Sequence, residues 1–309
     1  MNKNSIYVSI PSLPDKELYF TIHQCLTMAR NPKNIYIGIA YYNDLDSEVD
    51  PYELIKSFNN PNIKIKVYDI NDEKNRGIGA GRNDAKQFYN KQKYFLQIDS
   101  HTNFDKNWDK KMIRFYKKAL KKYGECVLTA CLPKYKRIEN EIDKIDSVSR
   151  YPIYDGFRPE SPMVPSIENT YLKTLKDTEY AIKVSASMIF AYGHLMENEQ
   201  IPRWANFWEE EVIQSINIFK NKVKIIFLQH APMQHLDNHC ITPGLNDRKI
   251  MSSYFSEEEE NKKIKITNEM FDIYLNENKV AVKEYEEYAG ISFSEKRVSG
   301  TNFIPRIVN

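Results

Sequence analysis

The order of apolar segments predicts an α/β fold in which helices flank a mainly parallel central sheet. Strand-like and helix-like segments alternate over residues 6–98, and this alternation is typical of parallel strands joined by crossover helices. The run at 94–98 ends abruptly in Asp99-Ser100-His101. Ligands of such sheets bind beyond the carboxyl ends of the strands, so fold class and polar residues agree.

Each element follows from its local pattern. Leu18, Ile22, Cys25 and Ala29 recur at spacings of three and four residues, which predicts a helix over 15–30. In the rest of the first half, strands are predicted at 6–10, 34–42, 63–69 and 94–98, and helices at 51–58 and 79–90. In the second half, strands are predicted at 126–132, 181–192 and 223–228, helices at 108–123, 208–220 and 280–288, and a long loop region at 134–179.

The predicted helix at 108–123 is amphipathic, with an apolar face that includes Trp108, Met112 and Tyr116. Its other side carries Lys110, Lys111, Arg114, Lys117, Lys118, Lys121 and Lys122. This basic side has two interpretations: a solvated surface, or a docking strip for an acidic partner or for phosphates.

The composition is that of an ordinary soluble chain. Its 309 residues are 41% hydrophobic with a mean hydropathy of −0.61, enough for one large domain or two small ones. No run reaches the roughly 18 apolar residues of a membrane span, and residues 1–11 are too short and polar for a secretory signal. Cys25, Cys126, Cys131 and Cys240 lack metal-type spacing, so we expect a reducing, cytoplasmic location. The net charge of +2 gives no global preference for nucleic acid.

Asp99 and His101 form a candidate metal pair. Alternation along an extended chain predicts that both lie on one side, with Ser100 facing away. A divalent cation held there would bind the oxygens of a diphosphate, and the imidazole makes Mn²⁺ at least as plausible as Mg²⁺. The competing interpretation is a polar loop after a core strand.

Four sequence blocks occur in order along most of the chain. They are 8–15 (Val-Ser-Ile-Pro-Ser-Leu-Pro-Asp) with 25–32 and 35–42, then 76–82 (Arg-Gly-Ile-Gly-Ala-Gly-Arg) through 94–101 to Trp108-Asp109, then 184–190 with 207–212, and finally 285–292. Together they resemble the GlcNAc-transferase family 60 of glycosyltransferases and, more remotely, the polypeptide GalNAc-transferases. Glu209 stands where that family has glycine before Glu-Glu.

This resemblance implies a GT-A-type, Rossmann-like domain over 1–240. Within it, 1–107 would form the nucleotide-sugar-binding half and 108–240 the acceptor-side half, with a lid loop and helical extension at 241–309. The third metal ligand of related transferases is a histidine after the last core strand, which favours His235, with His230 as runner-up and His239 less favoured. These histidines are alternatively capping or surface residues. Metal binding requires neutral imidazoles, so activity is expected to fall at mildly acidic pH.

Donor contacts are expected from the first half. Arg76 and Arg82 flank a glycine-rich turn that lets backbone approach a ligand. Arg82 is interpreted as a diphosphate or nucleotide contact, or alternatively as an ion-pair partner of Asp84 or Asp99. Three further donor-side residues are expected: Ser9 and Pro11 bordering the nucleoside, and Asp44 contacting the base or ribose or capping a turn.

Acceptor-side contacts are expected near residue 210. The resemblance assigns Glu210 and Glu211 to sugar hydroxyls or to orienting the attacking hydroxyl. Adjacent helical residues point about 100° apart, so one of them, with a slight preference for Glu210, is expected to face the cleft. Trp204 and Trp208 are expected to stack on a sugar or to belong to the core. Arg248 would close over the diphosphate or lie on the surface.

The sequence thus predicts a metal-dependent, retaining transferase that moves a sugar, GlcNAc from UDP-GlcNAc, to a protein hydroxyl. Alternative acceptors are a glycan or a hydroxylated nucleobase, the latter with slight support from the basic helix. A rival hypothesis is a catalytically inactive module that binds a sugar or a partner, for which Glu209 is the sequence hint.

Overall fold

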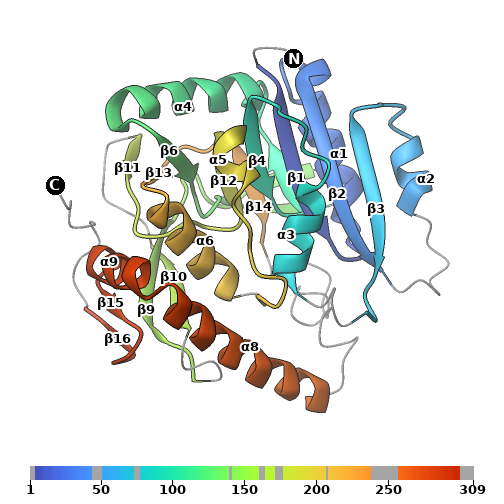
Figure 1. Ribbon diagram of the computed structural model, residues 1–309. Helices are drawn as coiled ribbons and strands as arrows, with labels where there is room; N and C mark the ends of the chain where they lie inside the picture. The colour runs from blue at the N-terminus through green and yellow to red at the C-terminus, as the bar shows by residue number, and fades with distance from the viewer. Residues whose placement is uncertain are drawn as a thin grey trace.

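An eight-stranded sheet with the order β11-β13-β6-β12-β4-β1-β2-β3 forms the centre of the computed structural model (Figure 1). The structure describes residues 4–43, 51–72, 77–138, 141–159, 164–170, 177–206, 208–237 and 257–299. The sheet strands are β1 (Ile6–Ser12), β2 (Ile35–Asn43), β3 (Ile63–Asp69), β4 (Tyr94–Ile98), β6 (Cys126–Thr129), β11 (Thr178–Tyr180), β12 (Met188–Tyr192) and β13 (Lys224–Leu228). Strands β3, β2, β1 and β4 run parallel, as do β6 and β13, whereas β12 and β11 are antiparallel to their neighbours. The predicted α/β class with a mainly parallel sheet is confirmed.

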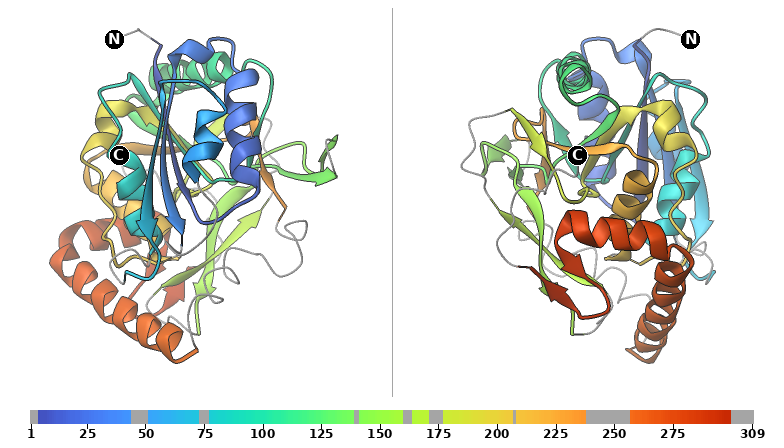
Figure 2. Two further views of the ribbon diagram at one scale, coloured as in Figure 1. Left: turned by 90° about the vertical axis from the view of Figure 1, so that its right-hand side faces the viewer. Right: turned by 60° about the vertical axis from the view of Figure 1, so that its left-hand side comes forward.

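Helices cover both faces of this sheet, with α1 and α3 on opposite sides of the strands (Figure 2, left). The helices are α1 (Glu17–Thr27), α2 (Pro51–Lys56), α3 (Ile78–Lys86), α4 (Trp108–Tyr123), α5 (Gly193–Glu197), α6 (Glu209–Lys220), α8 (Glu257–Glu277) and α9 (Lys279–Ala289), with a 3₁₀ turn at Pro32–Asn34. Trp108 on α4 donates its Nε1–H to the carbonyl oxygen of Cys25 on α1 at 2.8 Å. Arg82 on α3 contacts Glu210 on α6. Hydrogen bonds thus join α1 to α4, and α3 to α6.

The prediction of a long loop region at 134–179 is wrong. It contains β7 (Lys134–Ile138), β8 (Glu141–Lys144), β9 (Tyr151–Phe157), β10 (Pro165–Thr170) and the start of β11. Strands β7 and β8 join β5 (Thr102–Phe104) and β14 (Met233–Leu236) in a second sheet, and β9 pairs with β10. The described side chains of β8 are largely exposed, so its residues lack the apolar alternation that reveals a strand in sequence.

Two other elements differ from the prediction. Residues 181–187 leave the sheet before β12 begins, and α8 was not predicted as a helix. Helix α8 buries Thr267, Phe271 and Leu275. It is followed by α9 and by a hairpin of β15 (Ile291–Ser292) and β16 (Arg297–Val298). Tyr285 on α9 donates to the carbonyl oxygen of Ile182 at 2.9 Å, so this C-terminal part packs against the second half of the chain.

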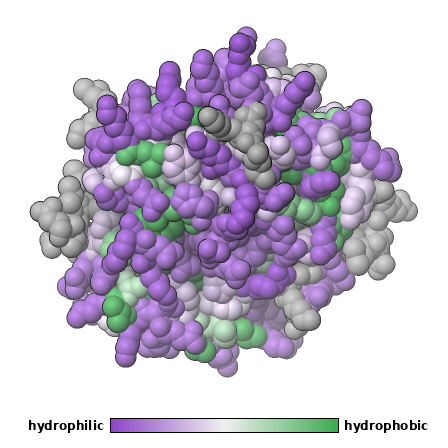
Figure 3. Space-filling view, turned by 45° about the horizontal axis from the view of Figure 1, so that its top comes forward, coloured by the Kyte–Doolittle hydropathy of each residue, from purple (hydrophilic) through white to green (hydrophobic). Residues whose placement is uncertain are grey.

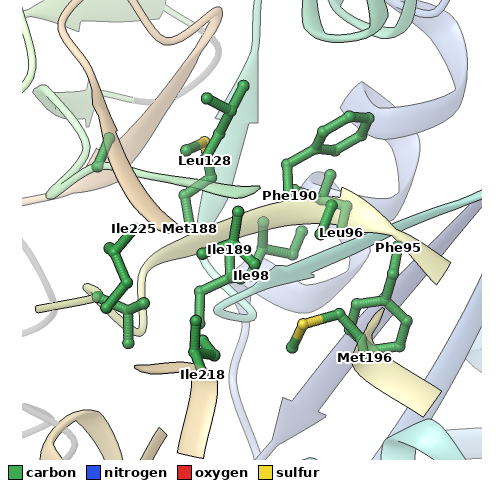
Figure 4. Close-up of a cluster of buried hydrophobic side chains, with 14 of the residues drawn as sticks. Phe95, Leu96, Ile98, Leu128, Met188, Ile189, Phe190, Met196, Ile218 and Ile225 are labelled. Carbon is green, nitrogen blue, oxygen red and sulfur yellow. The ribbon is translucent and has the colours of Figure 1, made fainter. Parts of the chain in front are cut away.

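The core lies around β4 and positions the polar residues that follow it. Figure 4 shows Leu96 and Ile98 of β4 among buried side chains of β6, β12, β13 and α6. Every residue of β4 is buried, so this strand is held on both faces. Because β4 ends at Ile98, the residues at its carboxyl end are Asp99, Ser100 and His101, of which Ser100 and His101 stay buried.

The basic side of α4 is exposed. The solvent-accessible residues on this side are Lys110, Arg114, Lys117, Lys118, Lys121 and Lys122. Figure 3 turns the top of the molecule, where α4 lies in Figure 1, toward the viewer, and hydrophilic residues cover most of the face that it shows. Within the described residues, no helix has the length and apolarity needed to cross a bilayer.

Candidate metal and donor site

Ligand atoms of Asp99, His101 and His235 converge at the carboxyl end of β4. All lie within 4.8 Å of one another. The two Nε2 atoms of His101 and His235 are 2.9 Å apart, and His235 Nε2 is 3.4 Å from Asp99 Oδ2. His235 reaches this place because β14 pairs with β5, which puts His235 opposite Thr102. The structure therefore brings together the three predicted ligands.

Asp99 and His101 do not converge by the alternation of an extended strand, as the sequence pattern predicts. The chain turns after Ile98, with the Thr102 hydroxyl donating to the Asp99 carbonyl oxygen at 2.9 Å. Ser100 does not face away from His101, since the Ser100 hydroxyl and His101 Nδ1 both contact Asp15 Oδ2, at 2.6 and 2.9 Å. A turn, rather than extended alternation, joins Asp99 to His101.

The two imidazoles have the orientation of metal ligands. His101 Nδ1 lies against a carboxylate oxygen of Asp15, and His235 Nδ1 lies 2.6 Å from the carbonyl oxygen of Leu236. Both neighbours only accept hydrogen bonds, so each Nδ1 carries the hydrogen and each Nε2 presents its lone pair. Two lone pairs on nitrogens 2.9 Å apart repel each other, and a cation bound by both nitrogens, lying beside the line that joins them, would offset this repulsion. Anchoring of the second ring nitrogen is usual for metal-bound histidine, so the site fits a divalent ion.

We expect Asp15→Ala to weaken Mn²⁺ binding about 10–100-fold, because His101 would lose the acceptor that holds its tautomer. Asp15→Asn keeps an oxygen acceptor and should lose less. Calorimetric titration with Mn²⁺ measures both. The control Asp105→Ala removes a half-buried carboxylate, paired with Lys144, that does not line the cavity. Equal Mn²⁺ affinity in wild type and Asp15→Ala would contradict the assigned role of Asp15.

Arg82 joins the metal cluster to α6. Its Nη2 donates to Asp99 Oδ1 at 2.7 Å, its Nε to Glu210 Oε1 at 2.6 Å, and its Nη1 to the carbonyl oxygen of Ile98 at 2.8 Å. The alternative pairing with Asp99 is thus present, whereas Asp84 pairs with Arg203. Because Arg82 binds Oδ1 of Asp99, Oδ2 is left to face His235.

The Arg82 guanidinium binds the carboxylates of both Asp99 and Glu210, but the pKa of Asp99 is lowered while the pKa of Glu210 is raised. Burial acts to raise the pKa of Asp99, but Arg82 together with the His235 and His101 rings holds it well below its ordinary value. Burial raises the pKa of Glu210 to about 7, opposed in part by Arg82 and reinforced by the charge of Asp99. Asp99 is therefore the ionised partner at neutral pH, and Glu210 titrates there.

The raised pKa of Glu210 predicts a pH-dependent stability difference between wild type and Glu210→Gln. Below pH 4.5 the carboxyl is protonated in both folded and unfolded chains. As pH rises from 4.5 to 7, the unfolded chain ionises first, so wild type loses stability that glutamine does not lose. Between pH 4.5 and pH 8, the free energy of unfolding of wild type should fall by up to about 3 kcal/mol relative to that of Glu210→Gln. Urea unfolding at pH 4.5, 6 and 8 measures it, and a pH-independent difference would contradict the assignment.

Glu210 and Glu211 both line the cavity, so the expectation that one of them faces it is wrong. Helix α6 begins at Glu209, and both residues belong to its first turn. Glu211 accepts a hydrogen bond from the Ala186 N–H at 2.7 Å and pairs with the fully buried Lys183. Its side chain is 15% exposed, against 3% for Glu210.

The cavity at this place has a volume of about 410 Å³. Its wall contains Pro11, Tyr42 and Gly81 on the side of β1 and β2, and Trp208 near α6. The Arg158 guanidinium carbon lies 3.2 Å from the centre of a Trp208 ring. Among the other predicted residues, Ser9 is buried in β1, Trp204 packs against the core and His230 is exposed. Asp44, Arg76, His239 and Arg248 lie outside the described residues.

The glycines before Arg82 approach protein backbone closely. A Cβ on Gly79 would lie 2.2 Å from the carbonyl oxygen of Pro202, and the Gly79 N–H donates to the Ala205 carbonyl at 3.1 Å. A Cβ on Gly77 would lie 2.8 Å from two carbonyl oxygens of the same segment. The start of α3 is therefore fixed against the segment that leads to α6.

Sequence reasoning assigned no role to Asp15, Lys134, Arg150 or Lys183. Asp15 ends the first sequence block, three residues after β1 ends at Ser12, and its place close to a strand end was a usable signal. Lys134 and Arg150 line the cavity but belong to the region expected to be loop. Their position depends on strand pairing that the sequence pattern does not reveal.

A family model described as Glycosyltransferase (GlcNAc) matches residues 45–235. The crystal structure of GalNAc-T7 with UDP, GalNAc and Mn²⁺ is 14% identical, with a TM-score of 0.57 over 76% of this chain and 45% of that chain. The crystal structure of TarS 1–349 from S. aureus is 15% identical, with a TM-score of 0.46 over 75% of this chain and 60% of that chain. This chain thus spans less than two thirds of either structure. A search of curated proteins finds no match. The likeness to GalNAc-T7 supports the GT-A fold.

Proposed function

We propose that this chain, which belongs to the GlcNAc glycosyltransferase family, is a metal-dependent retaining transferase that moves GlcNAc from UDP-GlcNAc to a protein hydroxyl. The convergence of Asp99, His101 and His235 at the end of β4 carries the proposal. The similar GalNAc-T7 structure contains UDP and Mn²⁺, which supports a nucleotide diphosphate as the group that meets these residues.

In this proposal Asp99, His101 and His235 hold Mn²⁺ or Mg²⁺. The bound cation supplies neutralisation of the charge that develops on the leaving diphosphate. Asp15 orients the ring of His101, and Arg82 orients Asp99 by holding its Oδ1 atom. Arg82 is 4% exposed and its donors are directed at protein oxygens, so we assign it a positioning role beside its predicted contact with the donor.

The acceptor side is formed by the first turn of α6. Glu211 is the more accessible carboxylate and is proposed to bind sugar hydroxyls, while Glu210 positions Arg82. Each carboxylate is held by a cation, which suits hydrogen bonding better than covalent attack on the anomeric carbon. The acceptor hydroxyl would then attack on the face from which UDP departs. Trp208 lines the cavity and is proposed to border the sugar.

The donor side is formed by the ends of β1 and β2. Pro11 and Tyr42 line the cavity and are proposed to border the nucleoside, with Ser9 behind them in β1. The division into a nucleotide-sugar half at 1–107, an acceptor half at 108–240 and an extension at 241–309 remains part of the proposal. Contacts from Asp44, Arg76, Trp204 and Arg248 remain predictions from the sequence.

Release of UDP tests the proposed function. The purified chain is incubated with UDP-GlcNAc, UDP-GalNAc or UDP-glucose, with Mn²⁺, with Mg²⁺ or with a chelator. We expect slow acceptor-independent UDP release that requires the metal and is fastest with UDP-GlcNAc. Release that is fastest with another sugar would correct the donor. Tight binding of UDP-sugars without release from any of them, even when hydroxyl acceptors are supplied, would favour a binding module.

A further inference from the structure

Among the described residues, three cationic side chains besides histidine line the cavity, and their charges are neutralised to different degrees. Arg82 has carboxylate oxygens at 2.6 and 2.7 Å, and Lys134 Nζ lies 2.9 Å from Asp237 Oδ1. The ion-pair contact of Arg150 is longer, with 3.9 Å between its Nε and Asp146 Oδ2. In the part of the chain that the structure describes, this Nε is buried without a hydrogen-bond partner. Of these three cations, Arg150 is therefore the one whose N–H donors are not all used by protein acceptors.

The carboxylates near Arg150 are directed at other groups. Asp146 Oδ2 accepts a hydrogen bond from the Lys134 N–H at 3.1 Å. Asp237 faces the Lys134 ammonium, and Glu211 faces Lys183 and the Ala186 N–H. Among the described residues, the contact of Arg150 with Asp146 at 3.9 Å is longer than the close, paired contact that a carboxylate forms with a guanidinium fork.

Arg150 lies on the side of β4 away from the nucleoside wall. Pro11 and Tyr42 belong to β1 and β2, the strands next to β4 on one side. On the other side come β12 and then β6, and the Arg150 N–H donates to the carbonyl oxygen of Cys131 just beyond β6, at 2.9 Å. Neighbouring strands are about 4.8 Å apart, so Arg150 is anchored about two strand spacings past the metal cluster. If the nucleoside of the donor lies against Pro11 and Tyr42 and its sugar lies beyond the end of β4, the acceptor would occupy the space on the side of Arg150.

We propose that Arg150, with Lys134 beside it, binds a phosphate or carboxylate group carried by the acceptor. This inference rests on the proposed function, because the position of the donor defines the acceptor side. A planar guanidinium matches the paired oxygens of either group. The acceptor of this enzyme is therefore anionic close to the hydroxyl that receives the sugar.

Inorganic phosphate is the probe for this site. It is titrated, by ³¹P NMR, onto protein saturated with UDP and Mg²⁺, so that the metal and diphosphate positions are already filled. We expect phosphate to bind in this state, and Arg150→Gln to weaken its affinity at least about tenfold. Arg150→Lys keeps the charge without the fork and should show a smaller loss. Arg114→Gln, on the exposed side of α4, is the matched control and should leave phosphate binding unchanged.

UDP binding, measured first on every variant, shows that the fold is intact. Wild-type protein that fails to bind UDP would refute the proposed function before phosphate is added, and titration without nucleotide would still decide whether Arg150 binds oxyanions. Displacement of phosphate by UDP or by UDP-GlcNAc would place the oxyanion in the donor and overturn the acceptor assignment. Equal phosphate affinity in Arg150→Gln and wild type would overturn the site itself.

Discussion

Asp99→Asn is expected to lower metal-stimulated UDP release at least about a hundredfold. Asparagine preserves the size of the side chain but removes the negative charge from the proposed ligand cluster of Asp99, His101 and His235. A metal ion contributes several kcal/mol to the stabilisation of a charged leaving group, and each 1.36 kcal/mol is a factor of ten in rate. The measurement is UDP release over a range of Mn²⁺ concentrations, together with calorimetric Mn²⁺ binding.

Asp105→Asn is the matched control for this experiment. Asp105 is also a partly buried aspartate with cationic neighbours, but it pairs with Lys144 and does not line the cavity. Its substitution should leave the metal response unchanged. If Asp99→Asn kept the metal-stimulated rate within a factor of three, the metal site would have to be assigned elsewhere.

Arg82→Met is expected to destabilise the fold by about 3–5 kcal/mol at pH 8. The substitution removes the cation that faces Asp99 and Glu210, and it leaves Glu210 buried and Asp99 partly buried without that partner. Methionine has a similar length, so the loss reports charge rather than a cavity. Urea unfolding followed by circular dichroism measures the free energy of unfolding. At pH 5 the loss should be smaller, because Glu210, with a pKa of about 7, is then protonated.

Arg297→Met provides the contrast. Arg297 pairs with Glu295 at 2.8 Å, but the two side chains are 70% and 60% exposed. Such a surface pair contributes about 0–1 kcal/mol. A cost for Arg82→Met no larger than that for Arg297→Met would mean that Asp99 and Glu210 are stabilised by other groups.

Local patterns were sufficient for the parallel half of the sheet and for α4. The predicted ranges 63–69, 94–98 and 108–123 coincide with β3, β4 and α4, since each has a continuous or periodic apolar pattern and a distinct end. The region at 134–179 failed because its strands are short and partly exposed, and because β7 takes its place in the second sheet by pairing with β14, about 100 residues further along the chain. Non-local pairing of this kind leaves little trace in sequence periodicity.

The candidate site divides in the same way. Asp99 and His101 are close in sequence, so the end of one strand indicated both. His235 joins them through pairing of β14 with β5, and its position in the sequence after β13 was the only local clue. The anchors of the site, Asp15 and Arg82, act through contacts across 86 and 17 residues of chain. Such contacts follow from packing, which no spacing rule describes.

The close approach at Gly79 limits how this enzyme can open. Helix α3, which carries Arg82, meets the segment before α6 at backbone contact, and a Cβ would not fit between them. The start of α3 and the segment before α6 are therefore fixed to each other, and we expect the parts of the cavity wall that they carry to move together if they move at all. Any opening of the cavity would then have to come from other parts of its wall, such as the second sheet, whose strand β14 carries His235.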